Sequence, residues 1–356
     1  MLPYFILIIL PMVVAAVRTK GIIRIGDGIA QNKRNTEITV FFGIFLALLV
    51  LRDKTCGSDT EAYFKMFEQF GQKSWSSAIS SSTVELGYTV FSKFIYLISG
   101  NARVFLVVAT AIIVIPLYWF YKKESELPVL TIMLFVVIAP FSMYFSGFRQ
   151  AMAMACVFPA WELARKKKWI KFLLLVLVAT LFHRSAFVIL ALYPLCHLRV
   201  TTKWLYVVAP LMVLIYIFNK PIFSFLMLLW GEESTVESVG ETTFLLLALF
   251  AVYAFVIADE EKLEKEVLGY RNILLLAVAI QSFASVHGLA MRMNYYFLPF
   301  IPVLIPKIAN RSKEGTKNLA NISVIVMTVF FAIYFFVRAY SSENIMRIYP
   351  YTFFWQ

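Results

Sequence analysis

The sequence predicts an all-α polytopic membrane protein, and three observations support that fold class. Of its 356 residues, 61% are hydrophobic and only 15% are charged, whereas a soluble domain is roughly half apolar and about a quarter charged. The mean hydropathy is +0.77. Apolar runs long enough to cross a bilayer recur from one end of the chain to the other. We therefore expect a single integral-membrane domain covering residues 1–356, without a soluble lobe.

The apolar runs predict about twelve membrane-spanning helices, with boundaries good to a few residues. The expected spans are 2–17, 38–51, 103–121, 128–145, 149–164, 169–183, 185–198, 203–219, 242–258, 272–290, 293–309 and 318–337. The fifth to seventh of these are short, so we expect them to be tilted or broken near the membrane face. The first run has no basic start and no small-residue cleavage site, so we expect a span and not a removed signal peptide. The three cysteines are far apart and lack metal-ligand spacing, which predicts neither a disulfide framework nor a zinc site.

The positions of the basic residues predict which loops face the cytoplasm. The net charge of +12 is better explained by cytoplasmic loops that orient the helices than by binding to nucleic acid. Of the 33 Lys and Arg residues, 21 fall in six short segments that the spans place on one side. These segments are 18–37, 122–127, 165–171, 199–203, 259–271 and 307–317. The opposite, extracytoplasmic side then receives both chain ends.

Two extracytoplasmic segments are large enough to form loops, residues 52–102 and residues 220–241. The first contains an aromatic set spaced for one face of an amphipathic helix lying at the membrane interface. That set is Tyr63, Phe64, Phe67 and Phe70. The second loop is acidic, with Glu232, Glu233, Glu237 and Glu241. The C-terminal residues 338–356 are also aromatic, which suits the lipid headgroup zone.

Three arginines at the ends of apolar runs form the main candidate for a binding site. Arg149, Arg184 and Arg292 all fall on the extracytoplasmic face, where basic residues are usually few. Such a cluster suggests a bound anion, and an anionic lipid phosphate is the natural candidate. Arg149 and Gln150 open a helix, whose N-terminus favours negative charge. The alternative for Arg149 is an interfacial anchor that reaches toward the headgroups.

The segment around His183 could supply acid–base chemistry. His183 and Arg184 interrupt an apolar run. A neighbouring guanidinium favours the neutral imidazole, which could then accept a proton. The alternative is a polar turn between two short helices, with Ser185 as a cap. His287 lies inside the membrane near Arg292. An ionisable residue there can mark a functional site, but a packing histidine that forms a hydrogen bond is at least as good an explanation.

The first extracytoplasmic loop adds a basic residue and two acids. Arg52 ends the second apolar run, and Asp59 and Glu85 are carboxylates near the membrane. Either acid could serve as a base, although Asp59 also fits the role of a helix cap. Tyr63 and, after Arg292, Tyr295 are further candidates for contact with a substrate.

Guanidinium groups at membrane depth fit a lipid-linked pyrophosphate better than a soluble nucleotide. Arginine can donate two hydrogen bonds to one phosphate and does not lose its charge. The sequence has no phosphate-binding loop and no dinucleotide-binding fingerprint. Fixed cations can stabilise the charge on a leaving pyrophosphate in place of a metal. We therefore expect no metal and no other cofactor.

Five segments of the chain stand out, in this order: RDKTCGSDTEAYFKMF, VELGYTVFSKFIYLI, FRQAMAMACVF, FHRSAFVIL and MRMNYYF. In these segments and in their order the chain resembles the EpsG family, a Wzy-like group of exopolysaccharide and O-antigen polymerases. The resemblance implies a bacterial inner-membrane enzyme with a helical bundle like that of the GT-C glycosyltransferases. It would transfer a growing glycan from one undecaprenyl-pyrophosphate carrier onto a sugar hydroxyl of the next carrier-linked repeat unit. A chain-length regulator is the expected protein partner.

The resemblance assigns expected roles to the candidate residues. Arg149, Arg184 and Arg292, together with Arg52, would hold the pyrophosphate. His183 is the preferred base, with Asp59 and Glu85 as alternates. The remaining substrate contacts would be Gln150, Tyr63 and Tyr295.

Two other functions remain open from the sequence. An O-antigen ligase would use the same donor, but it typically has a larger late extracytoplasmic loop than residues 220–241 provide. A flippase or transporter of the lipid-linked oligosaccharide would often show paired halves, and the sequence has no such symmetry.

Overall fold

The computed structural model describes residues 2–18, 35–138, 140–230, 241–340 and 346–356. Within these ranges the chain is helical, and pairing between extended segments is confined to two isolated bridges. The all-α prediction is therefore confirmed.

The helices of the first half of the chain are short, apart from α6. They are α1 (Leu2–Arg18), α2 (Thr36–Leu51), α3 (Thr60–Gln72), α4 (Trp75–Ser80), α5 (Leu86–Ile98), α6 (Ala102–Glu124), α7 (Pro128–Val137), α8 (Met143–Ser146), α9 (Phe148–Ala155) and α10 (Val157–Arg165). The second half contains α11 (Trp169–Phe182), η1 (Arg184–Ala191), α12 (Leu192–Leu195), η2 (Thr202–Trp204), α13 (Leu205–Ile217), α14 (Asn219–Trp230), α15 (Glu241–Val256), α16 (Lys265–Gln281), α17 (Gly288–Asn294), η3 (Leu298–Phe300), α18 (Ile301–Asn310), η4 (Glu314–Thr316) and α19 (Lys317–Tyr340).

Three stretches of the described chain are long and apolar enough to cross a membrane by themselves. They are Ala102–Glu124, Gly288–Asn310 and Glu314–Arg338. A bent pair, Thr202–Ile217 with Asn219–Phe225, turns by 77° and would add a fourth, and seven shorter apolar helices accompany them. This composition fits a polytopic membrane protein, whereas the expected number of about twelve full spans remains a prediction.

Several expected spans are interrupted, and local chemistry explains some of the breaks. Residues 128–145 divide into α7 and α8 around Pro140, which has no N–H for a helical hydrogen bond. Residues 149–164 divide into α9 and α10 at Cys156. Residues 185–198 begin as the 3₁₀ helix η1. The break at Cys156 has no equivalent signal in the local sequence.

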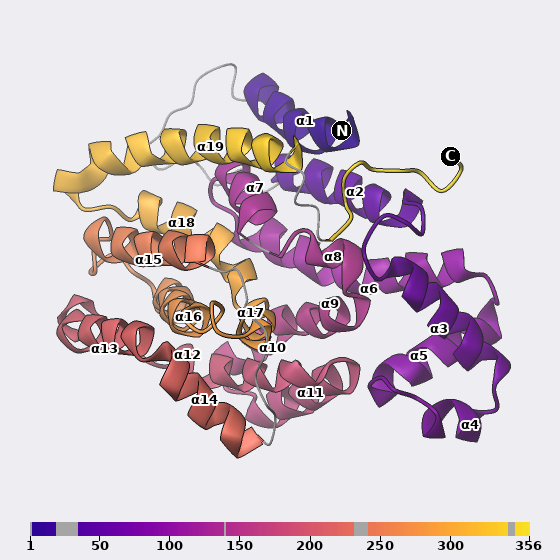
Figure 1. The fold of residues 1–356 in the computed structure, drawn as a ribbon. Coiled ribbons are helices and arrows are strands. Elements are labelled where there is room, and N and C mark those ends of the chain that lie inside the picture. The colour runs from indigo at the N-terminus through magenta and orange to yellow at the C-terminus, as the bar shows by residue number, and fades with distance from the viewer. Residues whose placement is uncertain (1, 19–34, 139, 231–240, 341–345) are drawn as a thin grey trace.

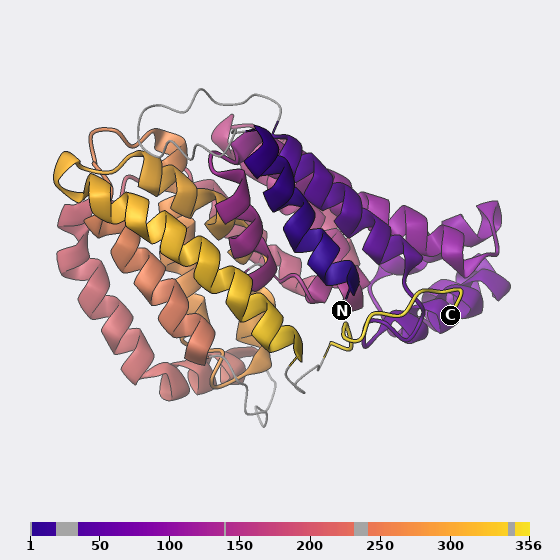
Figure 2. The ribbon, with the colours of Figure 1, turned by 90° about the horizontal axis from the view of Figure 1, so that it is seen from above.

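The helices pack in pairs that bring distant parts of the chain together. α1 packs on α2, α2 packs on α6, and α19 packs on α7 (Figure 1). α3, α4 and α5 project from one side of the bundle, and the C-terminal end lies beside them (Figure 2). The first extracytoplasmic loop of the prediction is therefore a small helical unit, in which α3 packs against α5.

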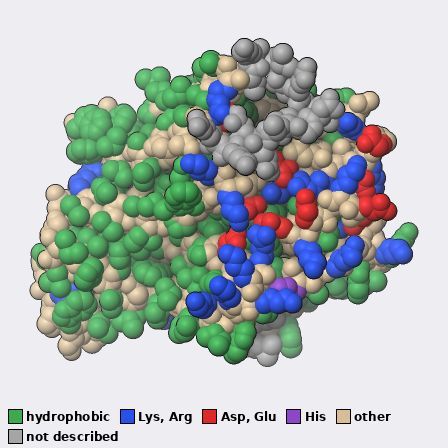
Figure 3. Space-filling view, turned by 180° about the vertical axis from the view of Figure 1, so that it is seen from behind, with side chains coloured by type: hydrophobic (Ala, Val, Ile, Leu, Met, Phe, Trp, Pro, Cys, Tyr) green, Lys and Arg blue, Asp and Glu red, His purple; other side chains and the backbone are tan. Residues whose placement is uncertain are grey.

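The loops predicted to share the cytoplasmic face contact one another. Asn35 Nδ2 donates to the carbonyl oxygen of Lys122 at 2.8 Å, and Arg311 Nε donates to Glu264 at 2.6 Å. At the other end of α6, Arg103 donates to the carbonyl oxygen of Arg52 at 2.6 Å. Acidic and basic side chains are interspersed over one region of the surface, beside a broad hydrophobic area (Figure 3). The structure therefore agrees with the prediction that these loops share one face. That this face meets the cytoplasm remains a prediction.

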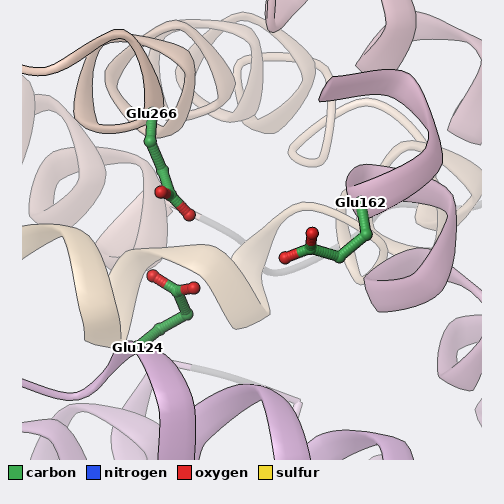
Figure 4. Close-up of side chains that lie close together, drawn as sticks. All are labelled: Glu124, Glu162 and Glu266. Atoms are coloured by element: carbon green, nitrogen blue, oxygen red, sulfur yellow. The ribbon is translucent and has the colours of Figure 1, made fainter. Parts of the chain in front are cut away.

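Three glutamates converge at this charged end, as Figure 4 shows: Glu124 on α6, Glu162 on α10 and Glu266 on α16. Basic side chains already pair with each of them. Glu124 lies 3.2 Å from Lys307, Glu162 lies 2.6 Å from Lys123, and Glu266 lies 2.5 Å from Arg165. The cluster is thus an ion-pair network that joins α6, α10, α16 and α18.

The predicted amphipathic helix around Tyr63 is α3, and its aromatic face packs on protein. Tyr63 stacks on Phe148 with ring centroids 5.0 Å apart, and Phe67 stacks on Phe105 at 4.8 Å. The prediction that this face lies at the membrane interface is therefore wrong. α6 and α9 supply the rings that bury it, and these helices are remote from α3 in sequence.

The second predicted extracytoplasmic loop is partly helical. Its first residues belong to α14, and Glu241 begins α15. Glu232, Glu233 and Glu237 lie outside the described residues.

The C-terminal segment 346–356 packs along the end of α2 and the residues that follow it. Asp53 N–H donates to the carbonyl oxygen of Thr352 at 2.9 Å, and Gly57 N–H donates to that of Arg347 at 2.8 Å. Tyr351 is buried and donates to the carbonyl oxygen of Leu48 at 2.8 Å, whereas Trp355 is 60% exposed. Within the described segment, only the last aromatic residues are therefore open to lipid headgroups.

Gly57 occupies a backbone position that no other residue tolerates well. Its φ is +98°, and a Cβ there would lie 2.2 Å from the carbonyl oxygen of Phe145. We expect Gly57→Ala to destabilise the fold by about 2 kcal/mol or more, measured as a lower melting temperature in detergent. Gly43→Ala is the matched control, since a Cβ at Gly43 in α2 meets nothing within 4 Å. An equal melting temperature for both variants would contradict this assignment.

Candidate functional site

The carboxylate of Glu85 joins three parts of the chain. Its Oε2 forms an ion pair with the guanidinium of Arg149 at the start of α9. Its Oε1 lies 3.0 Å from His183 Nδ1 and accepts a hydrogen bond from the main-chain N–H of Arg184 at 3.2 Å. The Glu85 side chain is 10% exposed and that of Arg149 is 27% exposed, so the pair is mostly buried but open on the arginine side.

Local structure explains why these groups meet. His183 ends α11 in an extended conformation, and the next N–H, of Arg184, begins η1 with no partner from an earlier turn. Glu85 supplies that partner from the position before α5. α5 can approach α11 closely because Gly87 has no side chain, since a Cβ there would lie 2.7 Å from the carbonyl oxygen of Leu181.

The surroundings of Glu85 keep it ionised. Burial raises the pKa of Glu85, but the hydrogen bond to His183, the main-chain donors and the Arg149 charge together lower it to about 2. An ionised carboxylate has no proton to donate, so Nδ1 of His183 carries the hydrogen of the bond to Glu85. In the neutral imidazole of this tautomer the lone pair is on Nε2, where it can accept a proton from a substrate.

Ionisation of Glu85 predicts a pH dependence of stability. Because the folded-state pKa of about 2 lies below the ordinary value of 4.5, the stabilisation by Glu85 is complete above about pH 4.5. It is lost as the pH falls from there through about 2. Wild type should therefore lose melting temperature faster than Glu85→Gln in detergent as the pH is lowered. Parallel loss in both proteins would show that the carboxylate does not carry this stabilisation.

Tyr63 extends the site on the other side of Arg149. Burial raises the pKa of the Tyr63 hydroxyl and the nearby Arg149 charge opposes that rise, while the ring stacks on Phe148. Asp59, one turn earlier, is exposed, and its Oδ1 accepts a hydrogen bond from Ser58 Oγ at 3.0 Å. It precedes α3 but makes no capping hydrogen bond. The structure therefore places Tyr63 near Arg149, whereas Asp59 is exposed to solvent.

Gln150 connects the start of α9 with the fifth motif. The buried Gln150 donates from Nε2 to the carbonyl oxygen of Arg292 at 2.6 Å, and its Oε1 has no partner among the described residues. The side chains of Arg184 and Arg292 are exposed. Tyr295 is half-buried, and its neighbour Tyr296 lies 3.2 Å from Ser185 across the fourth and fifth motifs.

Arg52 lies behind this site and not on its open side. Its side chain is fully buried, and Nη1 donates to the carbonyl oxygen of Leu49 at 2.8 Å. The guanidinium lies 5.5 Å from the ring of Phe145 and 5.0 Å from that of Phe148. These two rings flank the turn that leads to Arg149, so Arg52 supports that turn from inside the bundle.

Two positions that the sequence did not single out contribute to the site. Gly87 allows the approach of α5 to α11, and its only sequence signal is its place beside Glu85 in the second segment. Ser146 Oγ accepts a hydrogen bond from Ser58 N–H and donates to the carbonyl oxygen of Met346, both at 3.1 Å. Because Met346 lies 200 positions away, no local pattern could have found this link.

His287 has the packing role that the sequence left open. Its Nδ1 accepts a hydrogen bond from Leu289 N–H at 3.0 Å, which caps α17. Its ring stacks on Phe223 with centroids 5.3 Å apart. The residue is therefore a cap on its helix.

The four residues that come closest together, Glu85, Arg149, His183 and Arg184, fall in three of the five recognised segments. No curated protein and no solved structure gives a significant match to the chain. The EpsG family model matches residues 36–353, a range that contains every candidate residue and most of the chain. The protein therefore belongs to the EpsG family.

Proposed function

We propose that the protein is a polysaccharide polymerase of the bacterial plasma membrane. It transfers a growing glycan from undecaprenyl pyrophosphate onto the next undecaprenyl-pyrophosphate-linked repeat unit. Membership of the EpsG family supports a Wzy-like role in polysaccharide synthesis. The observation that carries the chemistry is the junction of Glu85, Arg149 and His183. It combines a fixed cation with an oriented imidazole at one end of the bundle.

The arginines would bind the pyrophosphate of the donor. Arg149 is held by Glu85 and remains 27% exposed, so it can contact an anion from the open side. Arg184 and Arg292 present exposed side chains from the neighbouring segments. A guanidinium binds phosphate through two parallel hydrogen bonds and keeps its charge. Three such groups would hold the diphosphate without a metal.

His183 would act as the base. Its Nε2 would take the proton of the acceptor hydroxyl while that oxygen bonds to the anomeric carbon of the donor sugar. The bond from this carbon to the pyrophosphate oxygen breaks, and undecaprenyl pyrophosphate leaves with the electron pair. The arginines stabilise the negative charge that builds on it. Glu85, in this proposal, is a positioning residue and not an alternate base, since its two oxygens are occupied by Arg149, His183 and Arg184.

The other candidates would act around this centre. Tyr63 would steady Arg149, and Gln150 and Tyr295 would contact the sugars or the carrier. Arg52 would add positive charge from behind the turn, and Asp59 would lie where an incoming glycan passes. A chain-length regulator remains the expected partner.

Reconstitution of the purified protein with a defined undecaprenyl-linked repeat unit tests the proposal. A polymerase produces a ladder of lengthening glycans. An O-antigen ligase would need lipid A core as acceptor and would make one transfer to each acceptor. A flippase would move the repeat unit between leaflets of a vesicle without making a glycosidic bond. Absence of laddered products from active, folded protein with both substrates present would overturn the polymerase proposal.

A further inference from the structure

A groove of about 450 Å³ lies between α11 and the following helices, at the end of α11 opposite His183. Its walls are Trp169, Phe172, Leu173, Leu190, Tyr193 and Pro194. The lining contains no charged side chain, and Leu173 and Leu190 are 44% and 42% exposed. Such a groove suits a hydrocarbon chain.

Basic side chains gather at the start of α11, the helix end whose first residues line this groove. Lys166, Lys167, Lys168 and Lys171 immediately precede or begin α11, and all four are exposed. Only Lys166 has an acidic partner among the described residues, Glu162 at 3.8 Å. Most of the positive charge of this lysine cluster is therefore not neutralised by the acidic side chains that the structure describes.

Further groups complete the rim. The exposed His197 packs edge-on against Tyr193, with ring centroids 5.2 Å apart. Trp169 is 56% exposed, lines the groove and directly follows Lys168 in the chain. An exposed tryptophan next to lysines is typical of the level where lipid headgroups meet hydrocarbon. The apolar groove and the unpaired lysines are independent features, and they meet at the same helix end.

We propose that this groove and the lysine cluster form a binding site for an anionic phospholipid. One acyl chain would lie in the groove, and the phosphate would contact Lys168 and Lys171 at the start of α11. Basic pockets between membrane helices recognise anionic headgroups in this way. The start of α11 adds unpaired N–H groups and the positive end of its dipole.

This site is separate from the proposed catalytic centre. α11 has 14 residues, so its two ends lie roughly 21 Å apart at 1.5 Å per residue. His183 follows one end, and the lysines stand at the other. The proposal therefore does not depend on the proposed function of the protein. The lipid would instead steady α11 and η1, the two elements that present His183 and Arg184.

Native mass spectrometry of the full chain in mixed micelles provides the test, with phosphatidylglycerol and phosphatidylcholine as probes. Each basic residue near an anionic lipid changes the affinity by about fivefold. We expect wild type to retain phosphatidylglycerol in clear preference, and Lys168→Gln/Lys171→Gln to weaken that retention by about 25-fold. The double variant Lys203→Gln/Lys265→Gln removes the same charge from exposed lysines elsewhere on the charged end. It should behave as wild type.

A second variant tests the groove. Leu190→Trp fills it from a half-exposed position and should reduce retention of phosphatidylglycerol by about tenfold, as expected for loss of one buried acyl segment. If Leu190→Trp lowers the melting temperature, Leu173→Trp is used in its place to fill the groove. Glycerol phosphate, which shares the headgroup but has no chain, should not compete. No preference for phosphatidylglycerol, an equal effect of the control pair, or unchanged retention after filling the groove would each overturn the proposal.

Discussion

Arg149→Met is expected to stop formation of long glycan chains, with a loss of roughly 10²- to 10³-fold in the rate of polymerisation. Among the described residues, Arg149 is the arginine of the site that a carboxylate holds in place. Its loss would remove a preorganised cation from the place where negative charge builds on the leaving pyrophosphate. The measurement is the in vitro ladder from equal amounts of purified wild type and variant.

The same substitution should also affect folding, which needs a separate control. Loss of Arg149 leaves the carboxylate of Glu85 mostly buried without its counter-charge, and we expect a destabilisation of about 2 kcal/mol. The double variant Glu85→Gln/Arg149→Met removes both charges and should recover most of that stability. The double variant reports on stability alone, because Glu85→Gln by itself should lower the rate. If Arg149→Met regained the wild-type rate at a lower temperature, where it is fully folded, Arg149 would be a structural residue and the proposed role in catalysis would be wrong.

The sequence predicted the long, uninterrupted helices and marked the fifth to seventh spans as tilted or broken, but it did not predict where the breaks fall. The apolar runs at 103–121 and 318–337 became α6 and α19 with small changes at their ends, because each run is long and uninterrupted. The division at Cys156 and the 3₁₀ turns after Arg184 have no strong local signal. They follow from the packing of α9, α11 and η1 against one another, which a local pattern cannot describe.

The candidate site shows the same limit at the level of single residues. The motifs identified Arg149, His183 and Glu85, but not that one carboxylate holds the other two. Glu85 and His183 are 98 positions apart, and their contact depends on the approach of α5 to α11 at Gly87. Arg52 was expected to bind the pyrophosphate because it is basic and near the membrane. The rings that enclose it come from α8 and α9, so its burial could not be read from its own segment.

His183→Gln is expected to lower the rate of polymerisation by about 10²- to 10⁴-fold, the usual contribution of a positioned base. Binding of the donor should change little, since the arginines remain. The limb of the pH–rate profile that reports the base should disappear. His287→Gln is the matched control, because His287 caps α17 and does not face Glu85. It should cost about 1 kcal/mol of stability and leave the rate near that of wild type.

Glu85→Gln tests whether the orientation and tautomer of His183 matter, because it leaves the histidine itself in place. The amide can still accept a hydrogen bond from Nδ1, but its NH₂ group can also donate to Nδ1 and so favour the tautomer with hydrogen on Nε2. That tautomer cannot take the acceptor proton. We expect a loss in rate comparable to that of His183→Gln, and the double variant Glu85→Gln/His183→Gln should lose little more than either single one. Losses that multiply in the double variant would show that the two residues act independently, and the proposed positioning role of Glu85 would fail.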